Sequence, residues 1–297
     1  MEDSEVLILG INGMLGHKLF MHLTKCEGLR VYGTARSREG CTKMFSSYYP
    51  DQNVFFGIDA HCSDSISSLI ASIKPDWVIN CIGIIKQSSL GNNHVENIYI
   101  NALFPHKLAQ ICEDNRIRLL HISTDCVFSG KVGSYTENDI SDAVDLYGRC
   151  KSLGEVSYPH CLTLRTSIIG HELCSRLGLI EWFLAQHDAI YGYTRHIFSG
   201  LPTIVLAQVI DVFILPQSNL SGIYNLSSQP ISKYDLLKLV AQQYGKKIDI
   251  IPYADTICDR SLDSTRLRSL LSYSLPSWPE MIEQMYQDYL TGPYGIR

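Results

Sequence analysis

The sequence predicts an α/β fold, a doubly wound parallel sheet followed by a smaller C-terminal lobe. Three observations lead to this prediction. Short apolar segments rich in β-branched residues alternate with helix-like segments over the first half of the 297-residue chain. These apolar segments are continuous rather than alternating, as burial on both faces of a sheet requires. Three glycines follow the first apolar segment, at positions 10, 13 and 16.

The elements of the first half follow from these patterns. The predicted strands are Val6–Leu9, Arg30–Thr34, Val54–Ile58, Trp77–Ile82, Leu119–Ser123 and Leu162–Ser167. The predicted helices, which carry apolar residues at helical spacing, are Met14–Leu23, Ser65–Ile73, Tyr99–Asn115 and Tyr147–Glu155.

The alternation weakens after Ile168. Residues 168–202 are rich in glycine, histidine and aromatic residues and look loop-like, whereas residues 203–215 are apolar again. Beyond them we expect a strand at Gly222–Asn225, an amphipathic helix at Ser232–Tyr244, a strand at Ile248–Pro252 and a closing helix at Glu280–Leu290.

The glycines lie between a strand and a helix, where a dinucleotide is commonly bound. One glycine permits the tight turn, another lets the backbone approach a pyrophosphate, and the third lets helix and strand pack closely. A glycine-rich turn without a ligand is the alternative, but the strand–turn–helix context favours a Rossmann-type site. The predicted contacts are Gly10, Asn12, Gly13, Met14, Leu15 and Gly16.

The end of the second strand indicates which dinucleotide binds. It carries Arg36, Ser37 and Arg38 and no acidic residue before Glu39. An acidic residue would bind the 2′-hydroxyl of NAD, whereas arginine suits a 2′-phosphate. We therefore expect NADP(H), with NAD(H) less favoured. Further cofactor contacts are expected at the ends of the third and fourth strands: Asp59, Ala60, Cys81, Ile82 and Gly83.

The expected domain boundaries follow the change in the strand–helix pattern after Ile168. We expect an NADP-binding domain over residues 1–167, to which residues 203–228 return. Residues 168–202 and 229–297 would then form the substrate-binding lobe.

A tyrosine and a lysine, Tyr147 and Lys151, lie four residues apart and so share one helical face. An ammonium beside a phenol lowers the phenol pKa, and such a tyrosine can exchange a proton with a carbonyl or alcohol oxygen. Tyr234 repeats the spacing in an apolar helix, so the spacing alone is weak. Thr124 ends the fifth predicted strand, at the edge where open sheets bind ligands, and favours the first copy. Asn101 is a candidate for holding the lysine through a water.

Together these residues resemble the extended short-chain dehydrogenase/reductase superfamily, and within it the dTDP-4-dehydrorhamnose reductase family. The resemblance covers nearly the whole chain. It rests on Gly10, Gly13 and Gly16, on residues 123–130, on Tyr147 and Lys151, on residues 164–167, and more weakly on residues 200–203 and 262–263.

The resemblance implies reduction of the C4 ketone of a nucleotide-linked 4-keto-6-deoxy sugar by NADPH. Tyr147 would protonate the new alkoxide, and Lys151 would bind the nicotinamide ribose and lower the tyrosine pKa. Thr124 would orient the carbonyl, and Asp125 would contact the substrate or brace the turn.

Two segments depart from the family pattern where the substrate would lie. Ile168 replaces a common aromatic residue, and residues 83–87, with Lys86, replace a run of small residues. The base and the sugar configuration therefore stay open. Arg260 is the candidate in the C-terminal lobe for contacting the diphosphate, although a solvated surface charge is the alternative.

Composition limits the partners. The formal net charge of −5 does not favour nucleic acid or an anionic membrane, and the longest apolar stretch is too short for a bilayer. The ten cysteines contain no Cys-x-x-Cys pair and are not accompanied by a His-x-x-x-His pair. We expect a cytoplasmic protein without a signal peptide, with reduced cysteines and without a metal site.

Two other functions compete with the reductase. An epimerase or dehydratase on the same scaffold would recycle its cofactor, but a dehydratase should place an acid–base carboxylate pair beside Thr124, where Cys126 follows Asp125. A non-catalytic NADP-binding regulatory subunit is the third possibility, because the resemblance extends to the β subunit of methionine adenosyltransferase. A homodimer is the expected assembly.

Overall fold

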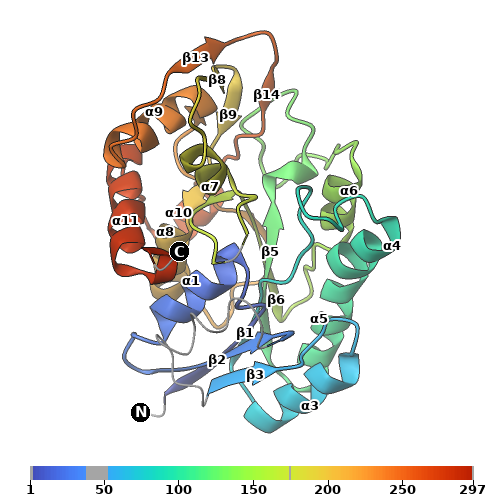
Figure 1. Cartoon of the computed structure of the whole chain (residues 1–297). Coiled ribbons are helices and arrows are strands. Elements are labelled where there is room, and N and C mark those ends of the chain that lie inside the picture. The colour runs from blue at the N-terminus through green and yellow to red at the C-terminus, as the bar shows by residue number, and fades with distance from the viewer. Residues whose placement is uncertain (1–2, 38–52, 174, 296–297) are drawn as a thin grey trace.

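A parallel sheet forms the centre of the structure (Figure 1). The computed structural model describes residues 3–37, 53–173 and 175–295. Among them, seven strands pair in the order β11-β6-β5-β4-β1-β2-β3, and every neighbouring pair is parallel. The strands are β1 (Ser4–Leu9), β2 (Leu29–Ala35), β3 (Val54–Phe56), β4 (Trp77–Asn80), β5 (Arg118–Thr124), β6 (Cys161–Thr166) and β11 (Gly222–Asn225).

Helices cover both faces of this sheet (Figure 1). On one face α1 packs on α8, and α8 packs on α11. On the other face α3 packs on α5, and α6 packs on η2. The bounds are α1 (Met14–Leu23), α8 (Thr203–Val209) continued by η4 (Ile210–Ile214), α11 (Trp278–Thr291), α3 (Ser63–Ile73), α4 (His94–Asn97), η2 (Ile98–Leu103), α5 (Phe104–Asp114) and α6 (Leu146–Leu153).

The two faces have separate apolar cores, and β1 contributes to both. Val6 and Ile8 belong to the core beneath α1 and α8, whereas Leu7 and Leu9 belong to the core beneath α3 and α5. All four side chains are fully buried. A strand buried on both sides must be apolar at every position, which confirms the reason for the predicted doubly wound sheet.

A second group of short elements lies beyond the carboxyl edge of the sheet, at the top of Figure 1. Three small sheets form there, with the orders β10-β7, β13-β8 and β12-β9-β14, and α9 packs on β8, β9, β12 and β13. The bounds are β7 (Ile168–Ile169), α7 (Leu179–Leu184), β8 (Ile190–Tyr193), β9 (His196–Phe198), β10 (Leu201–Pro202), β12 (Ile231–Ser232), α9 (Lys233–Gln243), β13 (Ile250–Tyr253), β14 (Cys258–Asp259) and α10 (Thr265–Leu271). The single-turn helices are η3 (Asp125–Val127) and η5 (Pro293–Gly295).

The loop-like prediction for residues 168–202 is wrong, because this segment contains α7 and four short strands, β7 to β10. These strands have two to four residues, too few for a period to appear in the sequence. They are held by distant partners, as when Ile190 of β8 pairs with Ile250 of β13. The predicted helix at Tyr99–Asn115 is confirmed but begins earlier, at His94, where the Asn93 side chain accepts a hydrogen bond from the Glu96 N–H.

None of the helices in the described ranges combines the length and the apolar composition that crossing a bilayer requires.

Candidate active site

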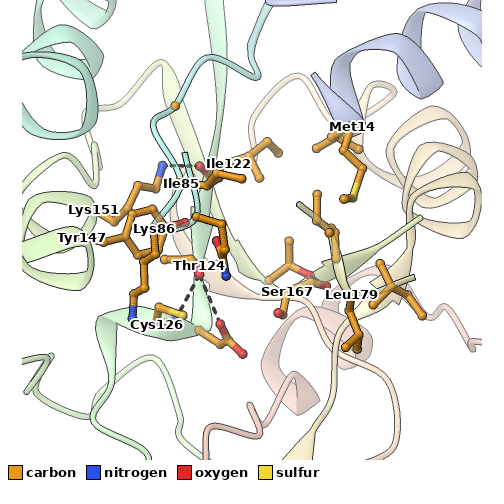
Figure 2. A pocket seen from close by; sticks show the side chains of 18 of the residues that line it. Met14, Ile85, Lys86, Ile122, Thr124, Cys126, Tyr147, Lys151, Ser167 and Leu179 are labelled. Carbon is orange, nitrogen blue, oxygen red and sulfur yellow. Dashed lines mark hydrogen bonds between the residues drawn. The ribbon is translucent and has the colours of Figure 1, made fainter. Parts of the chain in front are cut away.

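A cavity of about 520 Å³ lies between the carboxyl edge of the sheet and the small sheets beyond it. Figure 2 shows Tyr147, Lys151 and Lys86 on one side of the cavity and Met14 and Leu179 on the other. Most of the predicted site residues line it: Gly13, Met14, Leu15, Cys81, Ile82, Gly83, Lys86, Asn101, Thr124, Asp125, Tyr147, Lys151, Ile168 and Arg260.

Other predicted cofactor contacts lie away from the cavity lining. Arg36 and Ser37 are exposed at the end of β2, and Arg38 lies outside the described residues. Asp59 and Ala60 lie in the turn before α3, where the Asp59 carboxylate accepts a hydrogen bond from the His61 N–H at 2.9 Å. Gly10 and Asn12 lie in the turn that precedes α1, and Gly16 lies in the first turn of α1.

The three glycines of this turn have different physical roles. Gly10 has a φ of +84°, in the left-handed region that favours glycine. A Cβ on Gly16 would lie 2.2 Å from the Gly10 carbonyl oxygen, so only glycine lets α1 pack this closely. A Cβ on Gly13 would meet nothing closer than 3.5 Å. The fold itself therefore does not require glycine at position 13. We attribute the glycine there to a ligand that approaches the backbone.

The start of α1 offers polar groups to such a ligand. Gly13 is the N-cap residue and no side chain caps the helix. The Asn12 side-chain oxygen is buried without a hydrogen-bond partner among the described residues. Uncapped N–H groups and the positive end of the helix dipole favour an anion. This end of α1 therefore fits the pyrophosphate of a dinucleotide.

A buried histidine that sequence reasoning missed holds this turn. His17 contacts the Gly13 carbonyl oxygen through Nδ1 at 2.8 Å and the Tyr294 hydroxyl through Nε2 at 2.7 Å. A carbonyl can only accept, so Nδ1 carries the proton and Tyr294 donates to Nε2. Burial lowers the pKa of His17 to about 3, so the ring stays neutral. Nothing in the local sequence reveals a partner 277 residues away.

Two asparagines shape the loop after β4. The Asn80 side chain accepts a hydrogen bond from the Ile82 N–H at 3.1 Å. The Asn101 side chain accepts from the Ile84 N–H at 3.0 Å and donates to the Ile84 carbonyl at 2.9 Å. The Asn101 side-chain hydrogen bonds thus fix this loop, and its expected contact with the lysine through a water stays a prediction.

Lys151 is buried at the back of the cavity. Its ammonium donates to the Ile122 carbonyl at 2.7 Å and lies 3.5 Å from His121 Nε2 (Figure 2). Burial lowers the pKa of Lys151 to about 8, against the weaker opposing effect of Glu155. Burial also lowers the pKa of His121 well below its usual value, so this ring stays neutral beside the ammonium.

Tyr147 lies on the cavity wall, as does Thr124. The sequence spacing led us to expect Lys151 to lower the tyrosine pKa. The structure differs, because desolvation by the surrounding protein raises the pKa of Tyr147 above its usual value, and the neighbouring Thr124 hydroxyl opposes this only in part. The phenol is therefore held in its protonated form, which is the form that can donate a proton.

Thr124 and Asp125 belong to one short turn. The Thr124 hydroxyl accepts from the Cys126 N–H at 3.1 Å and donates to the Asp125 carboxylate at 3.2 Å (Figure 2). Asp125 is buried, and this burial raises its pKa against the opposing effect of Arg260. Arg260 donates to the Phe128 carbonyl at 2.8 Å, which places its guanidinium beside this turn at the cavity.

Lys86 forms part of the cavity rim. Its ammonium pairs with the Asp145 carboxylate at 2.8 Å and lies 5.5 Å from the centre of the Tyr147 ring. Asp145 is the N-cap residue of α6 and accepts from the Gly148 N–H at 3.0 Å. The lysine is thus tied to the start of the helix that carries Tyr147.

A buried ion pair that the sequence did not predict supports the site from behind. The Glu155 carboxylate accepts from Arg165 at 2.8 and 2.7 Å and from the Ser123 hydroxyl at 2.7 Å. The Arg165 and Glu155 side chains are 6% and 4% exposed. The pair joins the end of α6 to β5 and β6, next to Thr124.

The side of the cavity formed by the small sheets was also missed. Glu172, Ser175, Lys233 and Cys258 line it. They come from the segment predicted as loop and from the region of weak periodicity, so no sequence signal marked them.

A comparison with family models identifies the family of this chain. The family model described as RmlD substrate binding domain matches residues 4–291. A dTDP-4-dehydrorhamnose reductase of Aggregatibacter actinomycetemcomitans is 26% identical over 259 residues, which cover 78% of this chain and 87% of that protein. A probable low-salt glycan biosynthesis reductase of Haloferax volcanii is 26% identical over 237 residues, or 75% of this chain and 74% of that protein.

Among solved structures, a dTDP-4-dehydrorhamnose reductase from Bacillus anthracis in complex with NADP has the same fold. Its TM-score is 0.79 at 21% identity, and the match covers 97% of this chain and 99% of that one.

Proposed function

The chain belongs to the RmlD substrate binding domain family, and we propose that it is an NADPH-dependent reductase of a nucleotide-linked 4-keto-6-deoxy sugar. The observation that carries the proposal is the convergence of Thr124, Tyr147 and Lys151 on one cavity whose other end is the glycine turn. The names of the relatives, a dTDP-4-dehydrorhamnose reductase and a glycan biosynthesis reductase, support the same chemistry.

The residues present fit a nicotinamide dinucleotide. The freely accessible backbone at Gly13 and the uncapped N–H groups at the start of α1 would hold its pyrophosphate. Cys81, Ile82 and Gly83 would lie along the ribose, and Lys151 would contact the ribose hydroxyls. Arg36 would contact a 2′-phosphate, which is the basis for preferring NADPH. Bound NADPH supplies the hydride for the ketone carbon.

Tyr147 is the proposed acid. When the ketone is reduced, negative charge develops on its oxygen, and the phenol of Tyr147 donates a proton to that oxygen. The raised pKa of Tyr147 keeps the phenol protonated over the whole neutral range. Thr124, which lines the same cavity, orients the carbonyl oxygen toward the phenol.

Lys151 supplies a positive charge behind the tyrosine. Its ammonium donates to the Ile122 carbonyl and lies beside His121, and these contacts fix the side chain. In this buried position an ammonium stabilises developing negative charge more strongly than it would in water.

Arg260 and Lys233 are the proposed contacts for the substrate diphosphate, because both are cationic side chains that line the cavity. A planar guanidinium suits phosphate oxygens in particular. Asp125, whose pKa is raised by burial, would contact the sugar, while Lys86 and Ile168 would border it.

A dehydratase fits less well. Such an enzyme should carry a second carboxylate beside the turn of Thr124, and the residue after Asp125 is Cys126. A homodimer and a cytoplasmic location stay predictions from the sequence.

The test is oxidation of NADPH, with NADH in parallel, in the presence of 4-keto-6-deoxy sugars made in situ from dTDP-, UDP- and GDP-linked precursors. We expect oxidation with one of these nucleotides. Tight NADPH binding without oxidation by any of them would instead favour a regulatory subunit and would oppose the proposal.

A further inference from the structure

Three side chains with metal-ligating atoms meet at the far end of α1 from the cavity. His22 lies in the last turn of α1, Cys26 follows the helix, and Asp211 lies in the neighbouring η4. The Asp211 carboxylate oxygen Oδ2 lies 3.0 Å from His22 Nε2 and 3.0 Å from Cys26 Sγ. One ligand atom from each of the three residues can be chosen so that all three atoms lie within 4.8 Å of one another.

The fold explains this convergence. His22 and Cys26 are four residues apart, so the helical turn brings them to the same side. Asp211 follows 185 residues after Cys26 and is delivered by the packing of α1 against α8, which η4 continues. The cysteine and histidine spacings in the sequence contain no zinc motif because the third group comes from a distant helix.

We propose that His22, Cys26 and Asp211 form a binding site for a zinc ion. Imidazole, thiolate and carboxylate are the ligands that zinc takes in proteins, and a thiolate disfavours magnesium and calcium. The thiol of Cys26 loses its proton to solvent on binding, and His22 binds through Nε2 with its proton on Nδ1. Thiolate and carboxylate together then neutralise the two charges of the ion.

The distances permit this coordination. Ligand bonds of about 2.0–2.3 Å in a tetrahedral site separate the ligand atoms by about 3.3–3.8 Å. The two 3.0 Å separations found here need only a small outward rotation of the side chains. His22 and Asp211 are each 22% exposed, so a water can provide the fourth ligand.

The site is separate from the catalytic cavity, because none of the three residues lines that cavity. A bound ion would link α1, whose first residues form the dinucleotide turn, to η4. We therefore expect it to stabilise the fold without taking part in the reduction, and the proposal does not depend on the proposed function.

The experiment titrates the whole purified chain with Cd²⁺, whose bond to a thiolate absorbs in the ultraviolet, and then with Zn²⁺ in competition with a coloured chelator. We expect one metal ion per chain. Cys26→Ser should abolish the thiolate absorption and weaken zinc binding at least about tenfold, and Asp211→Asn should also weaken it. Cys62→Ser removes an exposed cysteine and is the matched control, which should bind as the unaltered protein does.

Thermal unfolding provides a second measurement of zinc binding. Zinc should raise the Tm of the unaltered protein and of Cys62→Ser, but not that of Cys26→Ser. Equal zinc affinity in Cys26→Ser and in the unaltered protein would overturn the proposal, as would absence of saturable binding. Unchanged NADPH affinity in Cys26→Ser would show that this variant is folded.

Discussion

At the scale of single residues, the proposed reduction depends most on Tyr147 and its protonated phenol. Tyr147→Phe removes the acid while keeping the ring on the cavity wall. We expect the reduction rate to fall by about 10²- to 10⁴-fold, the usual contribution of a positioned acid. NADPH affinity should change less than about twofold, since Tyr147 is only one of the predicted cofactor contacts and the glycine turn and Lys151 are unchanged. Steady-state kinetics and a fluorescence titration measure the two quantities.

Tyr234 provides the matched control for this variant. It repeats the spacing, with Lys238 5.2 Å from the centre of its ring, but it lies on α9 and does not line the cavity. Tyr234→Phe should leave the rate unchanged. Normal turnover in Tyr147→Phe would remove the proposed acid.

Lys151 predicts a pH dependence of cofactor binding. Burial lowers its pKa to about 8, so the ammonium is charged below this value and neutral above it. NADPH affinity should therefore fall by about tenfold as the pH rises through about 8, because a hydrogen bond from a charged donor is lost. A lysine with an ordinary pKa would keep its charge to about 10.4. Lys151→Met should bind weakly and without this fall, and an identical fall in this variant would assign the titration elsewhere.

At the scale of elements, the strand–turn–helix at the start of the chain is the part that the sequence predicted best. The predicted helix Met14–Leu23 has the bounds of α1, because the glycine at 13 and the apolar spacing mark its start. The segment 168–202 was predicted worst, because its strands are too short to show a period and are held by partners far along the chain. Periodicity in the sequence shows which face of an element is apolar. It does not show which distant strand the element pairs with in the folded molecule.

Two substitutions separate the roles of the glycines in that turn. Gly16→Ala places a Cβ against the Gly10 carbonyl and should lower the free energy of unfolding by about 1–3 kcal/mol, the usual cost of overpacking. Gly13→Ala meets no protein atom closely and should change it by less than about 0.5 kcal/mol. NADPH affinity should nevertheless fall in Gly13→Ala. Urea unfolding and NADPH titration test both, and full NADPH affinity in Gly13→Ala would contradict the proposed approach of the pyrophosphate.

The contact between the end of α6 and the central sheet depends on the Glu155–Arg165 ion pair. Glu155→Gln leaves the buried guanidinium of Arg165 without its counter-charge and should cost about 3–5 kcal/mol in the free energy of unfolding. Glu5→Gln is the control, because the Arg30–Glu5 pair is largely exposed, with the Arg30 side chain 55% exposed, and such pairs contribute less than about 1 kcal/mol. Similar losses in the two variants would contradict a structural role specific to the buried pair.

At the scale of the whole molecule, the site is assembled from both parts of the chain, and this limits what its sequence can predict. Thr124, Tyr147 and Lys151 could be found because each follows a strand or lies on a helix with a clear period. Lys233 and Glu172 could not, because only the docking of the small sheets brings them to the cavity. Asp211, which completes the cluster at the end of α1, could not be predicted for the same reason.

The central claim is that hydride passes from NADPH to the C4 carbon of a nucleotide-linked keto sugar. The most direct measurement uses NADPH that carries deuterium at the transferred position, with the sugar product analysed by NMR and mass spectrometry. We predict one deuterium at C4 of the sugar for each NADPH oxidised. Deuterium retained on the cofactor, whether the sugar is epimerised, dehydrated or unchanged, would contradict the claim.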